Sequence, residues 1–395
     1  MSSTASTAPT KKQRLEHVDA MRPLKQFGVV SNHVLLFFAP ALSITAGSLE
    51  LLLHVTREAF LFISACMLTY AYSDLKRGGY KRFYKRRAIT VLVPFICWTI
   101  IYFAITMPSG GYSLSHGLVH LLYLLGTGYY QLYYLVVIME FYLVFPLVMK
   151  LIKKTSRHWL VLGISLLIQL VYVSLMHWNI LPSFLQNFWA NREILSYQFY
   201  LIAGVIAALH FHQFHDWVVS HVRSIILWTA AATAVSEAWY LISLRPAFSW
   251  MAMNSAIDPF MPIMVPFNIG AILCIYLIGV YLVSDKRPKI IRAAAMSGSE
   301  NSYGVYVSQM LFISALFNFG WLSLSKNIPW DINIILEILI VFFGSVALTA
   351  LLARTPLSAI LTGRKKQKWS TLIPDYKKYL PNPNRSEFKE AEELS

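Results

Sequence analysis

The chain has 395 residues, of which 56% are hydrophobic and only 13% are charged. Long apolar runs recur between short polar stretches from about residue 24 to about residue 353, which excludes an ordinary soluble globular protein. The formal net charge of +15 could suggest nucleic acid, but the basic residues gather in the loops between apolar runs. We therefore expect the protein to lie in a lipid bilayer and to bind no nucleic acid.

Ten apolar stretches are long enough for a helix to cross the membrane, which needs about 20 residues for a hydrocarbon core of about 30 Å. They are rich in Leu, Ile, Val and aromatic residues and lack period-2 alternation, so they predict helices rather than barrel strands. In chain order, the predicted spans are Leu24–Ile44, Leu51–Tyr72, Ala88–Thr106, Leu132–Ile152, His158–His177, Ser196–Phe214, Ile225–Leu244, Pro259–Val283, Ser302–Leu322 and Ile332–Ala353.

The Lys and Arg residues alternate between the loops. The N-terminus, the loop from Lys76 to Arg87 and the loops at 150–157 and 286–292 are basic, whereas residues 45–50 and 107–131 carry no Lys or Arg. By the positive-inside rule, both the N- and the C-terminus lie in the cytoplasm. We predict an all-α, polytopic protein of the plasma membrane with about ten transmembrane helices.

Three parts of the chain follow from this pattern. Residues 1–20 form a cytoplasmic N-terminal segment, residues 21–354 form one transmembrane domain, and residues 355–395 form a flexible cytoplasmic tail. The outer segment Pro108–Leu132 is apolar but broken by Gly and Pro, so it either dips into the membrane or lies on its surface. The sequence leaves the oligomeric state open.

The first predicted span contains the stretch "DAMRPLKQFGVVSNHVLLFFAP", with His33 eleven residues after Arg22. Eleven residues of helix rise about 16 Å, which carries the chain from the cytoplasmic interface to roughly the middle of the bilayer. Eleven residues are also close to three turns, so both side chains share one helical face. Polar groups at membrane depth tend to mark pathways or chemistry. His33 is either a general base or an imidazole tied to a neighbouring helix.

Other charged residues lie within apolar spans. The side chains of Arg57 and Glu58 point about 100° apart on a helix, which favours separate partners. Glu140 lies close to Tyr134 in sequence; these side chains either line an acceptor pocket or make structural hydrogen bonds.

Two further groups favour a structural role. For Glu237 and Glu337 we expect hydrogen bonds to neighbouring helices. The histidines of "HFHQFHDW" do not share one helical face, so interfacial residues account for them better than metal ligands do. We expect no metal site and no tightly bound cofactor.

The segment "VDAMRPLKQFGVVSNH" resembles the opening signature of the acyltransferase-3 family of integral membrane acyltransferases, in which Asp-x-x-Arg precedes a histidine eleven residues after the arginine. Asp19, Arg22 and His33 occupy those positions. Four later segments resemble further helices of the family in the same order: "EAFLFISACMLTYAY", "FYKRRAITVLVPFICWTIIY", "YYQLYYLVVIMEFYLVFPLV" and "NSYGVYVSQMLF".

Two positions depart from the family pattern. Members often carry a paired Arg-x-x-Arg before the proline of the third helix; Arg87 matches the first position, but Thr90 occupies the second. The penultimate helix often carries a histidine where this chain has Gln309.

The resemblance implies an O-acyltransferase that moves an acyl group from cytoplasmic acyl-CoA, a co-substrate, to a hydroxyl of a carbohydrate or glycolipid acceptor. Catalysis would fall to His33, Arg22 and Asp19. Substrate binding would fall to Arg86, Arg87, Glu58, Tyr134 and Glu140. The chief rival is a transporter or flippase for a polysaccharide or lipid-linked sugar; a sensor or scaffold gives no reason for Arg22 and His33 to share a face.

Overall fold

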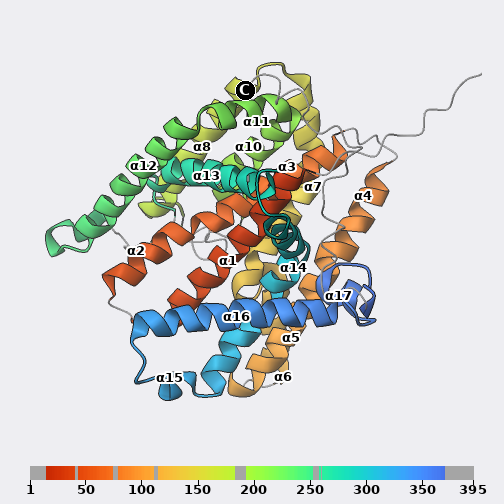
Figure 1. Cartoon of the computed structure of the whole chain (residues 1–395), viewed down its shortest axis with the longest axis vertical. Helices are drawn as coiled ribbons and strands as arrows, with labels where there is room; N and C mark the ends of the chain where they lie inside the picture. The colour runs from red at the N-terminus through yellow and green to blue at the C-terminus, as the bar shows by residue number, and fades with distance from the viewer. Residues whose placement is uncertain are drawn as a thin grey trace, which may run out of the picture.

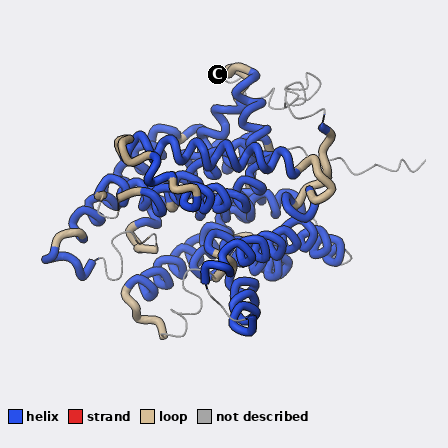
Figure 2. Tube along the Cα trace, turned by 90° about the horizontal axis from the view of Figure 1, so that it is seen from below, coloured by secondary structure: helices blue, strands red, loops and turns tan. Residues whose placement is uncertain are grey.

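A computed structural model of the chain describes residues 15–40, 43–73, 79–110, 114–182, 193–251, 258 and 260–369 (Figures 1 and 2). Within these residues the structure consists of helices joined by turns and contains no strand. The predicted all-α class is therefore confirmed for the described part of the chain.

The α-helices, with the labels of Figure 1, follow one another along the chain. They are α1 (Glu16–Phe38), α2 (Ile44–Leu53), α3 (Val55–Tyr72), α4 (Tyr80–Arg87), α5 (Val93–Gly110), α6 (Leu114–Thr127), α7 (Tyr133–Lys154), α8 (His158–His177), α10 (Gln198–Leu209), α11 (Phe211–Ser220), α12 (Val222–Ser243), α13 (Met264–Val283), α14 (Lys289–Asn318), α15 (Trp321–Leu324), α16 (Trp330–Leu352) and α17 (Ser358–Thr362). A π-helical turn, Ala88–Leu92, joins α4 to α5, and 3-10 turns occupy Tyr130–Leu132, Ile194–Tyr197 and Pro246–Met251.

Seven helical segments of the described chain are long and apolar enough to cross a membrane. An eighth is obtained if α10, with the turn before it, and α11 are counted as one span; these two are bent by 102° at the break between them. α1 and α14 are not among the seven, since both carry polar and charged residues along their length. The chain is thus a polytopic membrane protein, and the count of ten spans remains a prediction.

Helix α1 lies at the centre of the bundle in Figure 1 and packs against α2, α3, α13, α14 and α16. The hydropathy predicts that this span ends at Ile44, but the helix ends at Phe38. Ala39 is extended (ψ 149°) because it precedes Pro40, whose ring disfavours a helical preceding residue. His33 consequently lies in the last two turns of α1.

Residues after Ala353 pack against the membrane helices. α17 contacts α5 and the π-helical turn, and the indole Nε1 of Trp98 donates a hydrogen bond of 2.8 Å to the Leu361 carbonyl. Gly363 has a φ of +64°, and a Cβ at this position would collide with the carbonyl oxygen of Thr90. The first part of the predicted tail is therefore docked on the turn that follows α4; residues 370–395 lie outside the described residues.

Candidate active site

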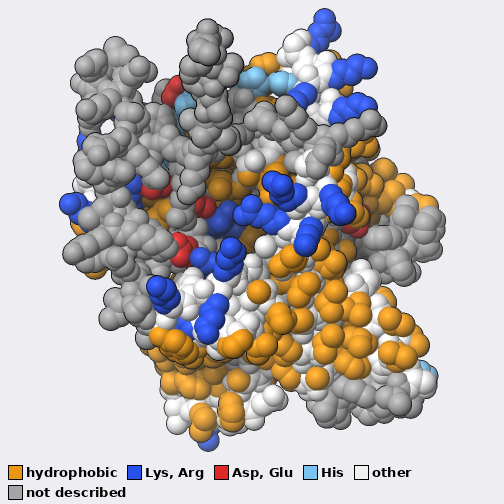
Figure 3. Space-filling model, turned by 90° about the vertical axis from the view of Figure 1, so that its right-hand side faces the viewer, with side chains coloured by type: hydrophobic (Ala, Val, Ile, Leu, Met, Phe, Trp, Pro, Cys, Tyr) orange, Lys and Arg blue, Asp and Glu red, His pale blue; other side chains and the backbone are white. Residues whose placement is uncertain are grey.

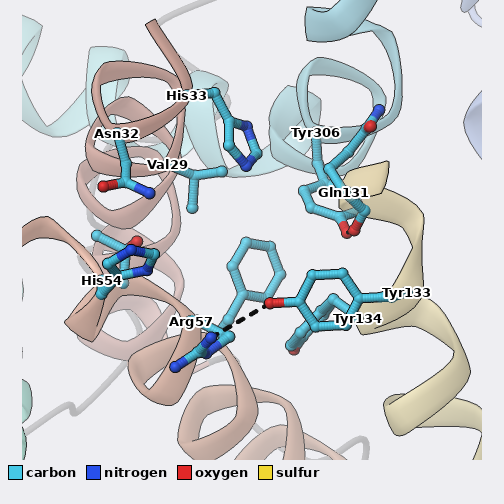
Figure 4. Close-up of a pocket in the computed structure, with 11 residues that line it drawn as sticks. Val29, Asn32, His33, His54, Arg57, Gln131, Tyr133, Tyr134 and Tyr306 are labelled. Atoms are coloured by element: carbon cyan, nitrogen blue, oxygen red, sulfur yellow. Dashed lines mark hydrogen bonds between the residues drawn. The ribbon is translucent and has the colours of Figure 1, made fainter. Parts of the chain in front are cut away.

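A cavity of about 70 Å³ lies between α1, α3, α7 and α14 (Figure 4). This volume holds a few water molecules or a small acyl group. Its walls combine hydrogen-bonding side chains with aromatic rings. The lining residues are Val29, Asn32, His33, His54, Thr56, Arg57, Phe60, Gln131, Tyr133, Tyr134 and Tyr306.

The His33 ring points into this cavity from α1. Its Nδ1 is buried and has no hydrogen-bond partner among the described residues, and Gln309 of α14 lies beside the imidazole. The ring centroid of Tyr130 is 5.7 Å from that of His33. A neutral imidazole that lines a cavity is able to accept a proton from a bound hydroxyl group.

Arg57 forms the opposite wall, from the first turn of α3 (Figure 4). Its Nη2 donates to the Glu58 carboxylate at 2.7 Å, and its Nη1 donates to the Tyr133 hydroxyl at 3.3 Å. The guanidinium carbon lies 5.0 Å and 4.3 Å from the ring centroids of Tyr197 and Phe260. The guanidinium is therefore held in one orientation.

The ion pair corrects the expectation that Arg57 and Glu58 take separate partners. Their Cα–Cβ vectors do diverge, but the Arg side chain is long enough to fold back along the helix to its neighbour. The Glu58 carboxylate is almost fully buried (2% exposed), and pairing with Arg57 offsets the cost of burying this charge. Glu58 does not line the cavity, so it acts on the cavity through Arg57.

Phe60 of α3, Tyr134 of α7 and Tyr306 of α14 pack together on the cavity wall. Phe60 and Tyr134 pack with ring centroids 5.0 Å apart, and Tyr306 lies 5.8 Å from each of them. The Tyr134 hydroxyl is 3.4 Å from the Ser64 hydroxyl, and the Tyr306 hydroxyl donates to the Gln131 carbonyl. Both phenols are thus anchored by polar contacts.

Arg22 and Asp19 form an ion pair of 3.4 Å on α1, one turn apart. Asp19 is buried (3% exposed), whereas a third of the Arg22 side chain is exposed. The pair lies toward the N-terminal end of α1, and neither residue lines the cavity. The structure therefore brings Asp19 to Arg22, as the family resemblance implies, and leaves His33 about three turns further along the helix.

Arg86 and Arg87 lie at the end of α4, and the structure separates their environments. Arg86 is exposed, whereas the Arg87 guanidinium lies among the rings of Tyr72, Phe83 and Tyr142, with centroids 5.2, 5.7 and 5.1 Å away. The Nε of Arg87 has no hydrogen-bond partner in the described part of the chain. Figure 3 shows Lys and Arg side chains gathered on the face that carries α4 and α17.

The two departures from the family pattern have structural counterparts. Thr90 lies in the π-helical turn after α4, and its hydroxyl donates to the Arg86 carbonyl at 2.9 Å. Single π-helical turns inside longer helices often occur at functional sites. Gln309 is fully buried, and its Nε2 donates to the Tyr306 carbonyl at 3.2 Å.

Three further carboxylates of apolar spans, Glu140, Glu237 and Glu337, make hydrogen bonds away from the cavity. Glu140 accepts a hydrogen bond from the Ile194 backbone at 2.8 Å, which favours its structural interpretation. Glu237 accepts from the Ser48 hydroxyl at 2.6 Å, and Glu337 accepts from the Asn333 amide at 3.0 Å on the same helix. Glu140 does not line the cavity.

The histidines around α11 pair with other helices. A ring nitrogen of His210 lies 2.6 Å from one of His158, and His215 Nδ1 lies 2.9 Å from the Tyr276 hydroxyl. Among the described residues, no group of three or more His, Cys, Asp or Glu side chains is placed to hold a metal ion.

Comparison with known proteins adds one match. The sequence model of the acyltransferase-3 family, described as an acyltransferase domain, matches residues 16–354. The chain belongs to the acyltransferase-3 family. No curated protein and no solved structure matches this acyltransferase. The match begins at the start of α1 and ends after α16. It therefore contains the whole cavity, the Asp19–Arg22 ion pair and the Arg57–Glu58 ion pair.

Sequence reasoning named only two lining residues of the acyltransferase cavity, His33 and Tyr134, as site residues. Arg57 was visible as a charge within an apolar span, but its place on the cavity wall follows from the pairing of α3 with α1 and α7. Gln131 and Tyr306 carried no signal, since an amide beside a loop and a Tyr in an apolar helix are common.

Proposed function

We propose that this acyltransferase moves an acyl group from cytoplasmic acyl-CoA to a hydroxyl of a sugar, glycan or glycolipid acceptor. The observation that carries the proposal is the His33 imidazole, which faces a polar cavity with one buried nitrogen left without a partner. Family membership supplies the reaction class, and the cavity supplies a place where an acceptor hydroxyl and the imidazole meet.

In the proposed reaction, a nitrogen of His33 takes the proton of the acceptor hydroxyl as its oxygen attacks the thioester carbonyl. The carbon–sulfur bond breaks, and the imidazolium returns its proton to the departing CoA thiolate. Less direct is a route in which the imidazole itself accepts the acyl group before passing it on. In both routes, Arg22 orients the donor at the N-terminal end of α1, and Asp19 holds Arg22.

The cavity wall supports an uncharged, hydroxyl-rich acceptor. Arg57 and His54 of the cavity wall each lie beside a carboxylate, at 2.7 Å for Glu58 and 3.8 Å for Glu50. The other lining groups include the side-chain amides of Asn32 and Gln131 and the rings of Phe60 and three tyrosines. Flat aromatic faces and amide hydrogen bonds suit the ring and hydroxyl groups of a neutral sugar.

The basic face around α4 supports a phosphate-bearing donor. A coenzyme A thioester brings several negative charges, and guanidinium groups bind phosphate through paired hydrogen bonds. Among the described residues, the Nε of Arg87 has no hydrogen-bond partner, and the guanidinium lies beside three rings. Arg87 therefore offers coenzyme A an N–H group for a hydrogen bond and an adjacent aromatic surface. Arg86, exposed one residue earlier, adds a second cation.

Mass spectrometry of surface glycans and glycolipids from cells with and without the gene tests the proposal. We expect a mass difference equal to one acyl group, restored by the wild-type gene, and release of CoA from labelled acyl-CoA by the purified protein in liposomes. An unchanged glycan profile, with sugar uptake into liposomes and no acyl turnover, would instead assign a transporter or flippase.

A further inference from the structure

The segment that follows α16, residues 355–369, lies outside the stretch that matches the acyltransferase-3 family. We call it the C-terminal segment. It is nevertheless held in place by hydrogen bonds to the membrane helices. The Trp98 indole of α5 donates to the Leu361 carbonyl at 2.8 Å, and the Gln367 amide donates to the Ala353 carbonyl, at the end of α16, at 2.8 Å. The C-terminal segment is therefore an ordered part of the fold.

Arg364 ties the C-terminal segment to α14. Its guanidinium donates to the backbone carbonyl of Glu300 and, at 3.2 Å, to the Glu300 carboxylate. The Arg364 carbonyl accepts a hydrogen bond of 2.9 Å from the Ser358 hydroxyl of α17. Lys365 and Lys366 follow directly and are exposed, and among the described residues neither side chain has a hydrogen bond or an ion pair. Arg364 thus fixes the path of the chain, and the two lysines are left for a ligand.

Gly363 places these lysines beside the turn that follows α4. Its backbone packs against the Thr90 carbonyl so closely that a Cβ would collide with the oxygen, and the Thr90 hydroxyl bonds to the Arg86 carbonyl at 2.9 Å. Lys365 and Lys366 come two and three residues after Gly363, so their Cα atoms lie within about 11 Å of it. Figure 3 shows Lys and Arg side chains gathered on this face.

Exposed cations repel one another, so a cluster of them suits a ligand that carries several negative charges. Attraction to lipid headgroups needs only positive charge near the membrane surface, and a chain in many conformations supplies it equally well. Fixed positions favour a single ligand whose anionic groups have a defined spacing, because less freedom is lost on binding. Thr90 is also the position at which the family pattern often carries an arginine, so this chain lacks one cation where the C-terminal segment docks.

We propose that the C-terminal segment completes the donor site, with Lys365 and Lys366 binding phosphate groups of the acyl-CoA beside Arg86 and Arg87. This inference rests on the proposed function, since it takes acyl-CoA as the donor. It adds two residues that the family match does not contain, so donor binding in this chain depends on a segment beyond the family domain.

The test measures thiol release by the purified full-length protein in vesicles of phosphatidylcholine, with acetyl-CoA or acetyl-pantetheine as the donor. Acetyl-pantetheine carries the same thioester and no phosphate. In Lys365→Gln/Lys366→Gln, the KM for acetyl-CoA rises about fivefold or more while kcat stays within about twofold, because charge-assisted contacts to phosphate are lost. The rate with acetyl-pantetheine stays that of the wild type.

Lys286→Gln/Lys289→Gln is the matched control. It removes two exposed lysines at the start of α14, and Lys289 lies eleven residues, or about 16 Å of helix, before Glu300. Its KM for acetyl-CoA stays that of the wild type.

A second set of vesicles contains phosphatidylglycerol and separates the donor from lipid as the source of the phosphate. The rise in KM is the same in both sets if the lysines bind the donor. A rise confined to the anionic vesicles assigns the lysines to lipid headgroups and overturns the inference, as does an unchanged KM or an equal loss of rate with acetyl-pantetheine. Failure of the folded wild type to release CoA from acetyl-CoA contradicts the proposed function itself.

Discussion

Arg57 and Glu58 are adjacent in the sequence and form a 2.7 Å ion pair inside the helical bundle, at the wall of the cavity that contains His33. The pair gives the cavity a fixed guanidinium group without a net positive charge. In the proposed function, an acceptor in the cavity would meet the hydrogen-bonding groups of Arg57 rather than an unbalanced cation.

We expect Arg57→Gln to lower the free energy of unfolding by roughly 3 to 5 kcal/mol, because the Glu58 carboxylate is left buried without its partner. The double variant Arg57→Gln/Glu58→Gln should lose less than the sum of the two single variants. Denaturant unfolding in detergent micelles measures these values. Additive losses would show that the two side chains do not depend on each other.

Arg87 and Arg86 should differ in their effect on the donor. Arg87→Lys keeps the charge but loses the planar group that lies among the three rings, so we expect the KM for acyl-CoA to rise about tenfold. Arg86→Lys, at an exposed position, should stay within about twofold of the wild type. Equal effects of the two substitutions would argue against a special role for Arg87.

Asp19 forms an ion pair with Arg22, and we expect this contact to position the guanidinium for the proposed reaction. Asp19→Asn removes the charge that holds the guanidinium at 3.4 Å, so we expect kcat to fall about tenfold with a smaller change in the KM for acyl-CoA. Asp19→Glu keeps the charge and should restore part of kcat. Steady-state kinetics separate these outcomes from simple misfolding, which would lower the amount of active protein without any rescue by Glu.

Gly363 should be intolerant of a side chain. A Cβ at this left-handed position (φ +64°) would meet the carbonyl oxygen of Thr90, so Gly363→Ala should lower the free energy of unfolding by about 1–2 kcal/mol or more. Gly163→Ala in α8 is the control, since nothing lies within 4 Å of a Cβ there. Thermal unfolding in detergent compares the two, and equal midpoints would contradict docking of the C-terminal segment on Thr90.

Hydropathy predicted the positions of most membrane helices well, because burial in lipid requires long apolar helices. The predicted span His158–His177 coincides with α8. The structure differs from the hydropathy at two places: Pro40 shortens α1, and the chain bends by 102° between α10 and α11, inside the predicted span Ser196–Phe214. Hydropathy reports how apolar a segment is and does not register such bends.

The site could be predicted only where a spacing carried information. Arg22 and His33 lie on one helix, so their shared face followed from helical geometry, and the contact of Asp19 with Arg22 spans one turn. Arg57, Gln131 and Tyr306 come from three other parts of the chain. Their meeting at one cavity depends on which helices are neighbours, and hydropathy contains no information on that order.

The most direct test of the account is the rate of acyl turnover by the His33→Ala variant, measured with labelled acetyl-CoA in liposomes at matched protein levels. General-base catalysis accounts for about 10² to 10⁴ in rate, so we expect a loss of at least about a hundredfold. His116→Ala, which changes an exposed histidine of α6 outside the cavity, should keep the wild-type rate. A His33→Ala variant that turns over acetyl-CoA as fast as the wild type would contradict the central claim.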